Sequence, residues 1–122
     1  MGWTIEYYEQ EDLVQPAKVF EDRLQQDHPE LRGKLIRIAD QLVIAGPQVG
    51  GGLIKACRGY KGLVEMRAIS GQWLARELFG FDGLRVVLLH GYIKRGGDAA
   101  SEPDLKKPMA IGRITNAPTR SA

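Results

Sequence analysis

The sequence predicts an α+β fold in which a helical hairpin packs against a small, mainly antiparallel sheet. An alternating stretch opens the chain, two segments with helical periodicity follow, and three strand-like segments separated by turn signals come next. The expected element order is therefore β-α-α-β-β-β. With 122 residues and no internal repeat, residues 1–122 are expected to form a single domain.

The first strand and both helices are predicted from hydrophobic periodicity. Polar and apolar side chains alternate in WTIEYY (3–8), as in a half-buried strand. Helices are expected at 12–27 and 28–46, because apolar residues recur there at helical spacing: Leu13, Ala17, Phe20 and Leu24, then Leu31, Leu35, Ile38 and Leu42. Pro16 must lie in or before the first turn of its helix. Gly46 and Pro47 end the second helix, and the short break between the two predicts a helical hairpin.

Three more strands are expected, at 63–69, 72–81 and 84–93, separated by turns at SG (70–71) and DG (82–83). The last strand contains VVLL with little alternation, which predicts a place in the middle of the sheet with both faces covered. The glycine-rich stretch 46–52 lacks the lysine of a phosphate loop and is predicted to be a linker. The tail, 96–122, is expected to be partly flexible, with a short helix at 104–114 and a disordered end.

Several classes of protein are excluded by composition. No apolar run approaches the roughly 18 residues of a membrane span, and the N-terminus lacks the pattern of a secretory signal. Cys57 is the only cysteine, so no internal disulfide forms, and with two histidines no structural zinc site is expected. We therefore expect a cytoplasmic protein without metal or other cofactor.

Charge is distributed unevenly along the chain. The net charge is +2, but residues 1–50 carry five Lys/Arg against nine Asp/Glu, whereas residues 51–122 carry twelve against six. A localised basic surface on a near-neutral protein is typical of a polyanion partner. A merely solvated basic face remains an equal alternative.

Polar side chains capable of proton transfer and anion binding gather in the predicted meander. Arg67 and Arg76 lie on adjacent strands, and the third strand ends in His90, Tyr92, Lys94 and Arg95. Few carboxylates accompany them, which disfavours a Mg²⁺-dependent nuclease, and no nucleophile elbow suggests a serine hydrolase. Such a set suits metal-independent RNA cleavage, in which the RNA 2′-OH attacks and the protein stabilises the phosphorane and moves protons.

Each of these residues also has a structural interpretation. Arg67 and Arg76 could pair with Glu65 and Glu77 across the strands. His90 could be a satisfied core histidine, and Tyr92 a packing residue. Arg76 shares strand parity with two leucines, which is unusual for an exposed residue unless a bulge intervenes.

Three segments in order, GYKGLVEMRA (59–68), WLAREL (73–78) and VVLLHGYIKR (86–95), give the chain a resemblance to a known family. It resembles the RelE/ParE superfamily of type II toxin–antitoxin toxins, and within it the HigB-like, phage-related group. The resemblance covers roughly residues 3–95 and implies a RelE-like fold. It also implies a toxin that inhibits translation by metal-independent, ribosome-dependent cleavage of mRNA.

Position by position, the resemblance implies that Arg76 and Arg95 stabilise the phosphorane charge and that Lys94 or His90 handles a proton, with Tyr92 as a further candidate acid. It implies that the substrate phosphates are held by Arg67, Lys55, Arg58 and Lys61.

The expected partners are the ribosome with its mRNA and a cognate antitoxin, expected to carry a helix-turn-helix domain, through which alone operator DNA would be bound. Two alternatives stay open: a ParE-like inhibitor of DNA gyrase, and a non-catalytic module that binds nucleic acid or protein.

Overall fold

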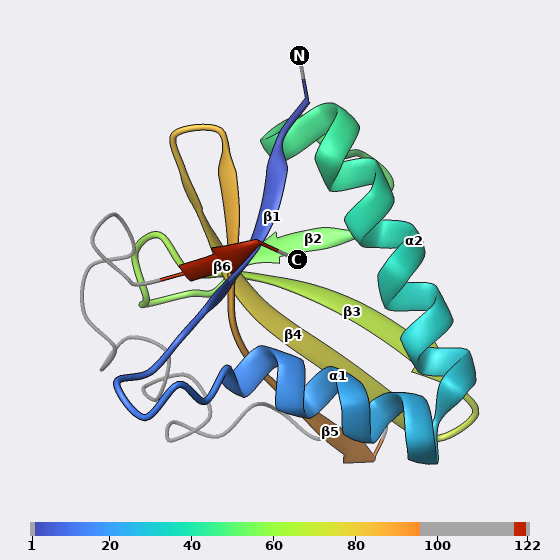
Figure 1. The fold of residues 1–122 in the computed structure, drawn as a ribbon. Coiled ribbons are helices and arrows are strands. Elements are labelled where there is room, and N and C mark those ends of the chain that lie inside the picture. Colours follow the sequence, from blue (N-terminus) through green and yellow to red (C-terminus); the bar gives the residue numbers. More distant parts are fainter. Residues whose placement is uncertain (1, 96–118, 122) are drawn as a thin grey trace.

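The computed structural model describes residues 2–95 and 119–121 and confirms an α+β architecture (Figure 1). The helices are α1 (Pro16–Asp27) and α2 (Pro29–Ala45), followed by a short 3₁₀ turn, η1 (Gly46–Gln48). The strands are β1 (Thr4–Tyr8), β2 (Ile54–Ala56), β3 (Val64–Ser70), β4 (Trp73–Asp82), β5 (Arg85–Arg95) and β6 (Thr119–Ser121). They form one open mixed sheet in the order β2-β3-β4-β5-β1-β6, in which only β1 and β5 are parallel among the described strands.

Three details differ from the sequence prediction. Helix α1 begins at Pro16, so Leu13 lies outside it, with a positive φ of 70° and an exposed side chain. Strand β2 was not expected, and the chain end, predicted to be disordered, pairs with β1 as strand β6. The helix predicted at 104–114 lies outside the described residues.

Both hairpins of the meander close through two-residue loops that begin with glycine. Ser70 pairs with Trp73 and Asp82 with Arg85, so Gly71 and Gly83 open the loops, and both have a positive φ near 58° and 59°. Glycine adopts this conformation without the steric cost that a Cβ would add. The turns predicted at 70–71 and 82–83 are therefore present, each displaced by one residue.

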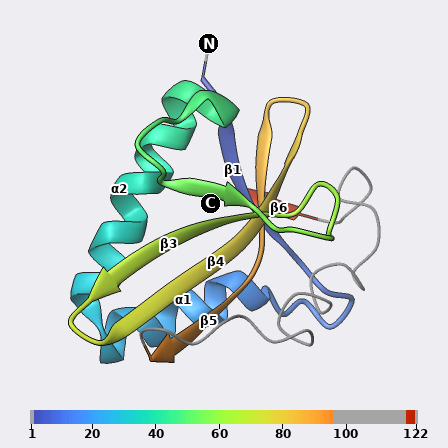
Figure 2. The same cartoon turned by 180° about the vertical axis from the view of Figure 1, so that it is seen from behind.

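Both helices cover the same face of the sheet, α1 over β5 and α2 over β3 and β1 (Figure 1). The main core lies between them and is built from leucines of α1 and α2 and from residues such as Met66, Phe79, Val86 and Leu88 of the sheet. Helix α1 approaches β5 so closely that a Cβ on Gly91 would lie 2.2 Å from the ring of Phe20. Viewed from behind, β3 and β4 lie in front of the helices (Figure 2). We call this second side the open face of the sheet.

Strand β5 lies between β4 and β1, as its aliphatic run predicted. Val86 and Leu88 belong to the core under the helices, whereas Val87 and Leu89 belong to a smaller cluster on the open face. That cluster also contains Leu63 and Leu78, and Cys57 and Tyr60 pack against it. The prediction that both faces of this strand are covered is confirmed for residues 86–89, because loop 57–63 covers that end of the open face.

A polar cluster lies within the main core. The Tyr7 hydroxyl donates to Glu21 Oε1 at 2.5 Å, and Arg32 donates to the same oxygen at 3.2 Å. The second carboxyl group, that of Glu77, is 2% exposed and hydrogen-bonds with Glu21.

Neither helix of the described chain is long and apolar enough to cross a membrane.

Candidate nucleic-acid interface

Strand register places several of the predicted site residues in rows across the open face. Arg67, Arg76 and Tyr92 are direct cross-strand partners, so one row runs across β3, β4 and β5. The next row on one side ends in Lys94, which pairs with Leu74, and the next row on the other side contains Glu65 and His90. The predicted proximity of Arg67 and Arg76 is therefore confirmed.

Arg76 lies at the centre of this arrangement. Its Nη1 donates to the Tyr92 hydroxyl at 3.3 Å, and its Nε lies 3.8 Å from Glu65 Oε2. The Arg76 side chain is only 14% exposed. Burial lowers the pKa of Arg76, but the Tyr92 hydrogen bond and the Glu65 charge outweigh burial, so its pKa is raised and the guanidinium stays charged. The structure thus provides a fixed cation in a partly desolvated position.

Leu74 and Leu78 lie on the same face of β4 as Arg76, and both are buried. Leu78 lies under loop 57–63 in the small open-face cluster, and a register shift at Leu78/Phe79 marks a bulge beside it. The open face therefore has an apolar end covered by the loop and a polar end around Arg76. The bulge lies beyond Leu78, so Leu74, Arg76 and Leu78 keep a common face.

Lys94 lies beside Tyr92, with its Nζ 5.7 Å from the centre of the phenol ring. A cation at this distance interacts favourably with the ring face. Tyr92 therefore joins the two cations, since its hydroxyl accepts from Arg76 and its ring lies next to Lys94. These three side chains form the compact part of the predicted site.

Arg95 is not brought together with the other predicted catalytic residues. It pairs with Trp73 and its guanidinium lies 5.5 Å from the centre of that indole ring, which in turn lies 5.2 Å from the ring of His28 between the two helices. Adjacent residues of a strand point to opposite faces, so Lys94 and Arg95 cannot both face the same ligand on a regular strand. The sequence placed both residues at one site, and the geometry does not bring them together there.

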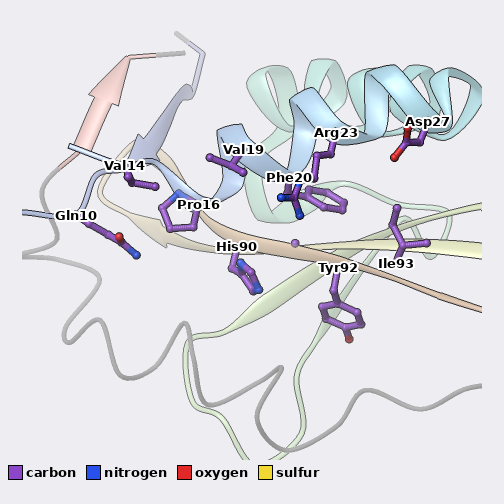
Figure 3. A pocket seen from close by; sticks show the side chains of 11 residues that line it. Gln10, Val14, Pro16, Val19, Phe20, Arg23, Asp27, His90, Tyr92 and Ile93 are labelled. Atoms are coloured by element: carbon purple, nitrogen blue, oxygen red, sulfur yellow. The ribbon is translucent and has the colours of Figure 1, made fainter. Parts of the chain in front are cut away.

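His90 lies at the rim of the site. It lines a groove between α1 and β5, together with Phe20, Arg23 and Tyr92 (Figure 3). In Figure 3, His90 and Tyr92 project from β5 on the side away from Phe20 and Arg23. His90 is half-buried. This exposure is intermediate between that of a core histidine and that of an exposed proton carrier, the two interpretations that the sequence left open.

The predicted substrate-binding residues occupy the β2–β3 end of the sheet. Lys55 on β2 is exposed and is the register partner of Glu65. Arg58 and Lys61 are exposed on loop 57–63, which is closed by a hydrogen bond of 2.9 Å from the Cys57 amide to the Leu63 carbonyl. Arg67 lies farther along β3, in the row of Arg76.

Two basic residues were missed by the sequence reasoning. Lys34 and Arg37 on α2 line a groove that Arg67 also lines. Their spacing of three residues places them on one side of a helix, which the sequence does indicate. They were overlooked because they belong to the acidic half of the chain.

Neither Cys57 nor Glu77 adds reactive chemistry to the open face. Burial first, and then the Glu65 charge, raise the pKa of Cys57 to about 11, so its thiol stays protonated at neutral pH. Glu77 lies on the helix-covered side of the sheet, so Glu65 is the acid that pairs with Arg76. Among residues 2–95 and 119–121, no group of three or more His, Cys, Asp or Glu side chains is arranged to hold a metal ion.

Comparison with known proteins assigns no family. No family model matches the chain, and no curated protein matches it significantly. The function must therefore be inferred from the chain's own residues and geometry.

Proposed function

We propose that this chain is a toxin of the RelE/ParE type, close to the HigB-like group, that inhibits translation by cutting mRNA on the ribosome. The observation that carries this proposal is the position of Arg76. It is a charged guanidinium fixed by Tyr92 and Glu65 on a sheet face that neither helix covers, and Lys94 lies beside Tyr92. The α+β order of the described elements is compatible with a RelE-like fold.

This arrangement suits RNA cleavage by the RNA's own 2′-OH. The 2′-oxygen attacks the adjacent phosphorus, the bond from phosphorus to the 5′-oxygen breaks, and the products are a 2′,3′-cyclic phosphate and a 5′-hydroxyl. Negative charge increases on the phosphorane oxygens during the attack, and a preorganised cation stabilises it most where water is excluded. Arg76 meets both conditions, because it is charged and mostly buried.

Proton transfer is assigned to residues beside Arg76. The 2′-OH must lose a proton and the leaving 5′-oxygen must gain one. Tyr92, Lys94 and His90 lie on β5 within two rows of Arg76, so they are the candidates for these two steps. Arg95, on the other side of the strand, is not assigned a catalytic role, and Arg67 takes its place as the second phosphate ligand because it is the register partner of Arg76.

One observation favours a second candidate function, RNA binding without cleavage. The ion pair with Glu65 neutralises part of the charge that Arg76 would offer a phosphate. If Glu65 does not release Arg76 when RNA binds, the open face would hold RNA phosphates through Lys55 and Arg67 and would leave the RNA uncut.

Cell-free translation with primer extension tests the proposal. Purified protein is added to a translating reaction, and mRNA ends are mapped for wild type, Arg76→Ala, Lys94→Ala and Lys18→Ala. We expect new ends only while ribosomes translate, with a rate about 100- to 1,000-fold lower for Arg76→Ala. Lys18→Ala is the control, because it removes an exposed cation on α1 that pairs with Asp22. Cleavage that survives Arg76→Ala would contradict the site, and intact mRNA with wild-type protein would favour the binding function.

A ribosome-independent inhibition of DNA gyrase is distinguished in the same experiment. Such an inhibitor would leave mRNA intact and translation running, and purified protein would instead block supercoiling by gyrase. The antitoxin implied by the resemblance is tested by whether co-expression of a candidate antitoxin suppresses the new mRNA ends. The ribosome is tested as a partner by whether those ends appear only while ribosomes translate.

A further inference from the structure

A basic groove lies on the far side of strand β3 from the open-face site. It has a volume of about 460 Å³ and lies between α2 and the edge of β3. Its lining contains three cations, Lys34, Arg37 and Arg67, and no carboxylate. Its apolar side chains include those of Ile38, Leu53 and Ile69.

The carboxylates of α2 lie elsewhere. Glu30 approaches His28 at 3.9 Å, and Asp40 lines a different cavity, next to Glu21 and Glu77. Within the described ranges, Arg37 and Arg67 form no ion pair. Three like charges around one groove repel one another, so a ligand that brings negative charge would relieve an unfavourable interaction.

The groove exists because β3 is longer than its neighbour β2. Strand β2 pairs with β3 only from Val64 to Met66, so the edge of β3 from Arg67 onward has no strand partner in the described sheet. Lys34 reaches across to this edge, where its Nζ donates to the carbonyl oxygen of Ile69 at 2.5 Å. An ammonium group has three donors, so two remain for a ligand.

Arg67 connects this groove to the open face. It is the register partner of Arg76, and it lines the groove on α2 as well. A polyanion held at Arg76 can therefore pass Arg67 at the sheet edge and reach Arg37 and Lys34 without crossing an acidic surface. We propose that single-stranded RNA bound on the open face continues over the edge of β3 into this groove. This inference rests on the proposed function for the identity of the ligand.

The lining of the groove fits single-stranded RNA in particular. Guanidinium groups such as those of Arg37 and Arg67 donate hydrogen bonds to phosphates, and bases stack on their planes. Apolar side chains lie between the cations, and Ile69 is 60% exposed. An unpaired strand can place its phosphates on the cations and its bases against these apolar surfaces, whereas the bases of a duplex are already stacked.

Fluorescence anisotropy with labelled, 2′-O-methylated oligoribonucleotides tests the path. Methylation blocks cleavage, so binding is measured apart from catalysis. Probes of about 4 and about 12 nucleotides are titrated at several salt concentrations with wild type, Arg37→Gln and Lys18→Gln. Both variants lose one exposed cation from a helix surface, but Lys18 lies on α1, outside the groove.

We expect Arg37→Gln to weaken binding of the long probe and to reduce the slope of log K against log salt by about 0.7, one phosphate contact. The short probe is held on the open face, so it should bind Arg37→Gln as tightly as it binds wild type. Lys18→Gln should bind both probes as wild type does. The inference is wrong if Arg37→Gln and Lys18→Gln behave alike, if the short probe loses as much affinity as the long one, or if wild type binds neither probe. It is also wrong if Arg37→Gln weakens binding of polyglutamate as much as of RNA, because the groove would then be a general anion site.

The result separates this inference from the proposed function. An Arg37 effect without mRNA cleavage would leave the RNA path in place and refute the nuclease. Cleavage that depends on Arg76, with no Arg37 effect on binding, would do the reverse.

Discussion

Replacing Glu77 with glutamine is expected to stabilise the protein at pH 6 and to have little effect at pH 4. Glu77 is 2% exposed and lies beneath the helices beside Glu21. Burial raises its pKa most, the hydrogen bond and charge of Glu21 raise it further, and Arg32 lowers it. The result is a pKa well above the ordinary value of 4.5, so the folded protein keeps a proton on Glu77 that the unfolded chain releases.

The sign and size follow from proton linkage. Because the folded-state pKa is the higher one, the contribution of Glu77 to stability is fully present below pH 4.5 and is lost as pH rises toward the folded pKa. The loss is about 1.4 kcal/mol for each pH unit. The loss continues only up to the folded-state pKa, so its size at pH 6 depends on how far that pKa lies above 4.5. Glutamine is neutral in both states and its amide can donate to Glu21, so the variant avoids this loss.

Urea unfolding at pH 4, 5 and 6 measures the difference, with the fluorescence of Trp3 and Trp73 as the signal. We expect the free energy of unfolding of Glu77→Gln to exceed that of wild type by an amount that grows from pH 4 to pH 6, with a slope of at most about 1.4 kcal/mol per pH unit, and that vanishes at pH 4. Glu11→Gln is the control, since Glu11 is exposed. A difference that stays constant with pH, or a variant less stable at pH 6 than wild type, would refute the reasoning.

Three further predictions concern packing, thiol reactivity and charge. Gly91→Ala should destabilise the protein by about 1–3 kcal/mol in urea unfolding, because its Cβ would meet the Phe20 ring at 2.2 Å, and Phe20→Leu in the same background should recover part of the loss. Cys57 should react slowly with iodoacetamide at pH 8 and faster toward its pKa of about 11; a rate that levels off below pH 9 would contradict this. Glu65→Gln removes the carboxylate 3.8 Å from Arg76 and should tighten binding of an RNA oligonucleotide by up to roughly fivefold, whereas weaker binding would show that Glu65 positions Arg76 rather than competes with the phosphate.

The helices and the meander could be predicted because their signals are local. Helical spacing of apolar residues and two hairpin glycines fix elements of 7 to 17 residues within one to four positions. Strands β2 and β6 have three residues each, too few for any periodicity to be visible. Their pairing depends on long-range contacts, which single-sequence patterns do not contain.

Strand parity decides which of the candidate site residues lie together. It places Arg67, Arg76 and Lys94 together on the open face, but the same alternation sends Arg95 to Trp73. The expectation that Lys94 and Arg95 lie at one site ignored that alternation. The contribution of α2 escaped prediction for a different reason, because the fold brings a helix of the acidic half against a strand of the basic half.

Parity also explains how a chain with a net charge of only +2 can present a basic surface. Arg76 and Glu77 are neighbours in sequence, yet one faces the open side and the other lies among buried groups under α1 and α2. Glu21 is likewise buried in the core. Two carboxylates, those of Glu21 and Glu77, thus lie beneath the helices, while the polar end of the open face carries cations whose field Glu65 only partly offsets. Affinity for RNA should therefore follow the local charge around Arg76, and its dependence on salt should be much steeper than the net charge would suggest.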